Sequence, residues 1–145
     1  MPGILIRHFV FIKLFIYKKE KEMKKEYVEF LNLLHGYLIR VKEIHWNTDT
    51  NSIHKICDEI QDCLMGLEDR FAECSMGIDD EEFKIGDLKP LLPNAEDLRG
   101  MLNELENDVL DMQDKLESGK ESGLLAICDE LIEMCCKYRY LAKQK

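Results

Sequence analysis

The sequence has few helix breakers and no Cys-x-x-Cys pair. Only 3 of its 145 residues are proline and 8 are glycine, so long helices can run without interruption, and a collagen-like or low-complexity chain is excluded. The six cysteines lack the spacing of a zinc ribbon or a thioredoxin-like motif, and most occupy apolar helical positions. They indicate reduced core thiols, from which we expect a cytoplasmic protein.

An excess of positive charge is also lacking. The chain has 20 basic and 29 acidic residues, which give a formal net charge of −9. Tight nucleic-acid binding needs a basic surface that displaces counterions from phosphates, so we expect no nucleic-acid partner. An acidic surface can instead attract cations.

No apolar run is long enough to span a bilayer. The first 17 residues are apolar, but Arg7, His8 and Lys13 interrupt them, so we expect no membrane association. The polar segment YKKEKEMKKE follows, where a signal peptide would need a cleavage site with small residues. We assign no function to residues 1–22, which we treat as a leader. We expect that Met23 is the true translation start and that the start at Met1 is mis-called. We place one domain at residues 23–145.

From Met23 onward, apolar residues recur at alternating steps of three and four, the spacing of a helix that presents one face to a core. The pattern predicts four helices, the second ending near Gly77 and the third beginning at Asn94 as its N-cap. The four stripes are Tyr27, Leu31, Leu34, Leu38, Val41 and His45; Ile53, Cys57, Ile60, Leu64, Leu67, Phe71 and Cys74; Leu98, Leu102, Leu105, Val109, Met112 and Leu116; and Leu124, Cys128, Leu131, Cys135, Tyr138 and Ala142.

Residues 77–93 contain two glycines and two prolines and form the one long connection. Four amphipathic helices with a long connection between the second and the third predict an all-α four-helix bundle. The first helix also carries a second apolar face, formed by Phe30, Leu33, Tyr37 and Ile44. Because such a face is usually buried, we expect it to pack against another chain in a homo-oligomer.

The second helix carries two pairs of candidate metal ligands. His54 and Asp58 are one turn apart, as are Asp69 and Glu73, so each pair can reach one ion. The two pairs are separated by roughly 16 Å of helix rise, which is too far for a common ion. Both sets are symmetric about position 63.5, so an antiparallel second copy would bring the first pair of one chain to the second pair of the other.

We expect His45, at the end of the first helix, to fold in beside this site. Each of two identical sites would then hold His45, His54 and Asp58 from one chain, with Asp69 and Glu73 from the other. Imidazole and carboxylate ligands suit iron, zinc or manganese, and redox chemistry would select iron. The alternative is that the histidine packs in the core and that the carboxylates are ordinary solvent-exposed residues of a helix face, without a metal.

In these residues the sequence resembles the Dps family, the mini-ferritins of the ferritin-like superfamily. The matching segments are HW at His45 and Trp46, HKICD at 54–58 and EDRFAE at 68–73, and the intervals within the second helix fit the family pattern without a gap. The loop between His45 and His54 is shorter than the family's. Elsewhere in residues 25–143 the likeness is limited to bundle architecture and the segment GDLKPLLP.

The resemblance implies a ferritin-like bundle with a ferroxidase site between two-fold-related subunits. Such a protein oxidises Fe(II) with hydrogen peroxide or dioxygen, stores the ferric product in a hollow, typically dodecameric shell, and protects against oxidative stress. His45 and His54 would be imidazole ligands of iron, Asp58 and Asp69 would be carboxylate ligands or would orient ligands and waters, and Glu73 would bind iron most directly. Trp46 would lie beside the site and intercept oxidising equivalents, with packing at an interface as its alternative role. The alternative function is a ferritin-like bundle that acts as a structural or interaction protein without ferroxidase turnover.

Overall fold

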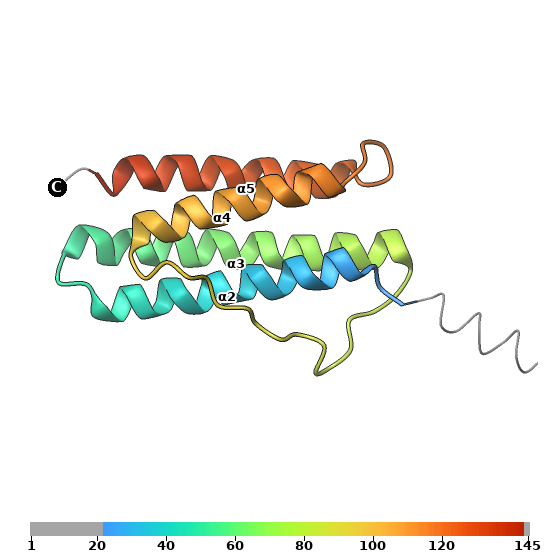
Figure 1. Cartoon of the computed structure of the whole chain (residues 1–145), viewed down its shortest axis with the longest axis horizontal. Helices are drawn as coiled ribbons and strands as arrows, with labels where there is room; N and C mark the ends of the chain where they lie inside the picture. Colours follow the sequence, from blue (N-terminus) through green and yellow to red (C-terminus); the bar gives the residue numbers. More distant parts are fainter. Residues whose placement is uncertain (1–21, 144–145) are drawn as a thin grey trace, which may run out of the picture.

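A computed structural model of the chain describes residues 22–143. In this part of the chain the fold is all-helical, with α2 at Lys25–Asn47, α3 at Asn51–Asp79, α4 at Leu98–Lys115 and α5 at Ser122–Leu141. Figure 1 shows two antiparallel hairpins, α2 with α3 and α4 with α5, packed side by side. Contacts also join α3 to α5 and α2 to α4, which closes the four-helix bundle predicted from the sequence.

The four apolar stripes form the core, as predicted. Leu34, Leu64, Leu105 and Leu131, one from each helix, are fully buried, and nearly all other stripe residues are buried with them. The stripes of α2 and α3 end in partly buried residues at the ends of the bundle, among them His45. The spacing of three and four therefore identified the inward side of every helix.

The predicted start of α4 was wrong. Its N-cap is Asp97, whose carboxylate accepts a hydrogen bond from the backbone N–H of Gly100, and the helix begins at Leu98. Asn94 lies before the helix, where its backbone N–H and that of Ala95 donate to the carboxylate of Glu104. In a helix that began at Asn94 these N–H groups would have no intrahelical partner, whereas here Glu104 satisfies them in a non-helical segment before Asp97.

The inference drawn from the second apolar face of α2 was also wrong. Phe30 is 2% exposed and packs on Phe71 of α3, with ring centroids 4.8 Å apart. Tyr37 is 1% exposed, and its hydroxyl donates to Asp108 of α4. Leu33 and Ile44 are partly buried against the same core. The chain covers this face itself, so the face gives no reason to expect a second copy.

The long connection, residues 80–97, returns along the outside of α2 from the end of α3 to the start of α4 (Figure 1). The backbone N–H of Leu91 donates to the carbonyl oxygen of Asn32, 3.0 Å away, and the guanidinium of Arg40 donates to the carbonyl oxygens of Pro93 and Ala95. Gly36 lies directly beneath: a Cβ there would overlap the carbonyl oxygen of Leu91. Glycine thus allows the two backbones to touch.

The cysteines are free thiols, as expected. Three are buried, and burial raises the pKa of Cys57 to about 11 and those of Cys128 and Cys135 to about 12. A thiol with so high a pKa is a poor nucleophile at neutral pH, which fits a packing role. The expectation of a core position was wrong for Cys63 and Cys136, which are exposed.

No helix between residues 22 and 143 is long and apolar enough to cross a bilayer. The leader assigned to residues 1–22 lies outside the described residues except for Glu22.

Candidate metal centre

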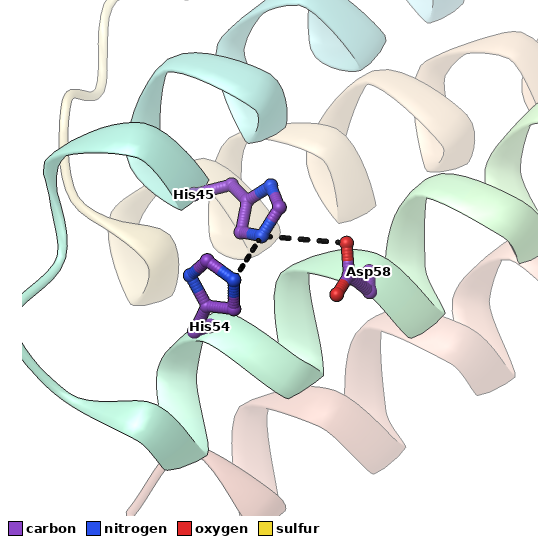
Figure 2. Close-up of side chains that lie close together, drawn as sticks. All are labelled: His45, His54 and Asp58. Atoms are coloured by element: carbon purple, nitrogen blue, oxygen red, sulfur yellow. Dashed lines mark hydrogen bonds and ion pairs between the residues drawn. The ribbon is translucent and has the colours of Figure 1, made fainter.

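The turn between α2 and α3 brings two histidines together. Helix α2 ends at Asn47 and α3 begins at Asn51, so only three residues separate them. His45 lies in the last turn of α2 and His54 in the first turn of α3, and in an antiparallel hairpin these turns are neighbours. Figure 2 shows both imidazoles and the carboxylate of Asp58, one turn further along α3, pointing at a common position. We call these three residues the histidine–aspartate cluster.

Two distances in this cluster are close to those expected between ligands of a single cation. His45 Nε2 lies 2.8 Å from His54 Nε2 and 3.4 Å from Asp58 Oδ1. One ligand atom from each residue can be chosen so that all three lie within 4.8 Å of one another. Two ligands bound to one ion at about 2.1 Å are roughly 3.0–3.4 Å apart for bond angles between a right angle and the tetrahedral angle. The shorter loop therefore does not keep His45 from the cluster.

The facing nitrogens also decide which ring atoms can carry protons. With Nε2 opposite Nε2, the two neutral imidazoles form a hydrogen bond only if one of these atoms donates and the other accepts. A cation would accept both lone pairs instead, which leaves the proton of His45 on Nδ1. That Nδ1 is buried and has no hydrogen-bond partner among the described residues. Metal-bound histidines usually donate this proton to a carboxylate, a carbonyl or water.

The cluster lies at the surface. The side chain of His45 is 14% exposed, whereas that of Asp58 is 58% exposed. Solvent and ions therefore reach the ligand atoms from the Asp58 side. Three donors leave a cation with open coordination positions, because zinc takes four ligands and iron or manganese up to six.

Asp69 and Glu73 are exposed on the same helix and lie outside the cluster. Within a single chain they lie too far along the helix to reach His45. The five-residue site shared by two chains stays a prediction. Trp46 is 70% exposed, and the ammonium of Lys42 lies 6.0 Å from the centroid of its ring.

Two features of α3 did not emerge from the sequence. Met65 is 48% exposed and, seven residues after Asp58 and four before Asp69, shares their side of α3. Glu68 is buried, and its Oε1 lies 2.8 Å from Nδ1 of His35. Burial raises the pKa of the Glu68 carboxyl, and the hydrogen bond with His35 acts in the opposite direction. The steps of four and three from Leu64 through Glu68 to Phe71 could have indicated this burial.

Comparison with known proteins gave no match to a family model, to a curated protein or to a solved structure.

Proposed function

We propose that this chain is a Dps-like mini-ferritin, which oxidises Fe(II) at a site shared by two copies and stores or detoxifies the product. The observation that carries the proposal is the convergence of His45, His54 and Asp58 on one position beside the turn that joins α2 to α3. Two imidazoles and a carboxylate are ligands that iron accepts, and they require no thiolate.

The position of the remaining carboxylates supports a shared site. Asp69 and Glu73 follow the cluster along the exposed side of α3 at the spacing that mirrors His54 and Asp58. In an antiparallel pair of α3 helices, each cluster of one copy would face Asp69 and Glu73 of the other, and two equivalent sites would result. Such pairs are the proposed units of a larger homo-oligomer, which could extend to a dodecameric shell in the cytoplasm.

The proposed reaction transfers electrons from bound ferrous ions to an oxidant. In the overall stoichiometry, two ferrous ions give two electrons to one hydrogen peroxide, which takes up two protons and yields two waters. Carboxylates favour the ferric product because they add negative charge around an ion whose positive charge has increased. Trp46, which follows His45 in the sequence and is 70% exposed, would pack at the interface or intercept oxidising equivalents that escape.

The experiment is ferrous iron oxidation by the purified full chain. We expect oxidation faster than in buffer and a ferric product that stays in solution, measured by absorbance after addition of hydrogen peroxide or air. An Asp69→Ala, Glu73→Ala variant keeps the histidine–aspartate cluster but lacks the proposed second half, so it should oxidise iron at the buffer rate. If the unsubstituted chain gives no acceleration over buffer, the protein is better described as a structural or interaction bundle.

A further inference from the structure

We propose that a divalent transition-metal cation in the histidine–aspartate cluster controls the pairing of two copies through α3. The inference rests on the proposed shared site and adds its regulation: the cation is the switch for assembly as well as the species that is oxidised. It follows from the charge on the face of α3 and from a cluster that is already formed in one chain.

The face of α3 that would pair is strongly acidic. The helix contains seven acidic residues and two basic ones. Asp58, Asp62, Asp69 and Glu73 are all exposed. In an antiparallel pair centred on position 63.5, Asp58 lies opposite Asp69 of the second copy, and His54 lies opposite Glu73 of that copy. Each site then gathers three carboxylates, with Asp62 next to them.

Few positive charges oppose this repulsion. Arg70 forms an ion pair with Glu130 of α5 in its own chain. Lys55 is the other basic residue of α3, and it lies beside His54 at the edge of the pairing face. On α3 itself, one lysine per site does not neutralise three carboxylates, so pairing without a cation is opposed by the like charges that the two α3 helices bring together.

A bound cation replaces the repulsion between the two acidic faces with attraction. The two imidazoles and Asp58 supply three ligands in one chain, which leaves the ion with open positions. Asp69 and Glu73 of a second copy would fill these positions and would be neutralised by the ion. The cation therefore binds a pair more tightly than a single chain, and by thermodynamic linkage it must stabilise the pair by the same factor. Because a pair contains two sites, the dissociation constant of the pair falls by the square of this factor.

The test is the dissociation constant of the pair, measured by sedimentation of the full chain over a dilution series. Zn²⁺ is the probe because it takes the same ligands as ferrous iron but has no redox chemistry. If each site gains about tenfold in cation affinity on pairing, Zn²⁺ should lower the dissociation constant by about 100-fold relative to EDTA. Mg²⁺, which prefers oxygen ligands and keeps its waters, should change it by less than about threefold at equal ionic strength.

An Asp69→Asn, Glu73→Gln variant separates the two parts of the argument. It keeps the cluster but removes the repelling charges, so it should pair more tightly than the unsubstituted chain in EDTA and lose most of the response to Zn²⁺. Its control, Asp111→Asn, Asp114→Asn, makes the same charge change at exposed positions of α4 and should respond like the unsubstituted chain. Both variants retain all six cysteines, so zinc bound to thiols cannot explain a difference between them.

The proposal is overturned if the dissociation constant is the same in Zn²⁺ and EDTA, if the pair persists in EDTA at every dilution, or if the Asp69→Asn, Glu73→Gln variant responds like its control. These outcomes are distinct from failure of the proposed function. Pairing that depends on Zn²⁺ without iron oxidation would contradict only the ferroxidase, whereas iron oxidation by a permanently paired protein would contradict only the switch.

Discussion

Replacing His54 with alanine is expected to lower the initial rate of ferrous iron oxidation by about 100-fold or more, to the rate in buffer. His54 supplies one of the three atoms in the histidine–aspartate cluster, with its Nε2 2.8 Å from that of His45. Removing even a residue that only supports a metal ligand costs about 10–100-fold in affinity or activity, and removing a ligand should cost at least as much. Because His54 is exposed, the fold should be unaffected, and the melting temperature should stay within a few degrees.

The matched control is Asp62→Asn. Asp62 is exposed on the same helix, four residues after Asp58, but it does not belong to the cluster. Its replacement should leave the oxidation rate within about threefold of the unsubstituted chain, because Asp62 supplies none of the three ligand atoms of the cluster and its charge contributes only to the general attraction of cations and to the repulsion between paired α3 faces. Oxidation at an undiminished rate by the His54→Ala variant would show that the cluster is not where iron reacts.

The Gly36→Ala substitution is expected to have the largest effect on stability. The new Cβ would overlap the carbonyl oxygen of Leu91, and a backbone atom cannot move aside as a flexible side chain can. The connection would have to lift from α2 and give up the hydrogen bond between Leu91 and Asn32. Overpacking of this kind costs about 3 kcal/mol, which corresponds to a melting temperature lower by roughly 10 °C. Limited proteolysis should also cut residues 80–97 more readily.

Gly66→Ala is the control for this prediction. Gly66 also lies inside a helix, and a Cβ there would meet nothing within 4 Å. Alanine should therefore stabilise α3 by about 0.5–1 kcal/mol, the usual gain over glycine in a helix. If the Gly36→Ala variant melted at or above the temperature of the Gly66→Ala variant, the described contact between α2 and the connection would be wrong.

The helices and their inward sides could be predicted because each local pattern agrees with the packing. Leu102, Leu105 and Val109 follow one another at steps of three and four, and all are fully buried. Helical periodicity predicts which face of a helix is buried, whichever element covers that face. The pairing of His54 with Asp58 could be predicted for the same reason, since residues one turn apart must share a side of the helix.

Features that depend on contacts between distant segments could not be predicted in this way. The start of α4 differs from expectation because Glu104, ten residues away, satisfies the N–H of Asn94. The second apolar face of α2 was assigned to a partner because the sequence does not show that Tyr37 donates to Asp108. The need for glycine at position 36 depends on Leu91, far along the chain. Periodicity describes one helix at a time and contains none of these relations.

A mixing experiment tests most directly whether two copies share each site. His54→Ala damages one half of the site and Glu73→Ala the other, so each variant alone should oxidise iron at the buffer rate. When equal amounts are dissociated and paired again, half of the pairs should contain one chain of each kind, and each mixed pair should have one intact site of two. The account predicts recovery of about a quarter of the unsubstituted activity. A mixture that forms mixed pairs, verified by mass, yet remains as inactive as its components would contradict it.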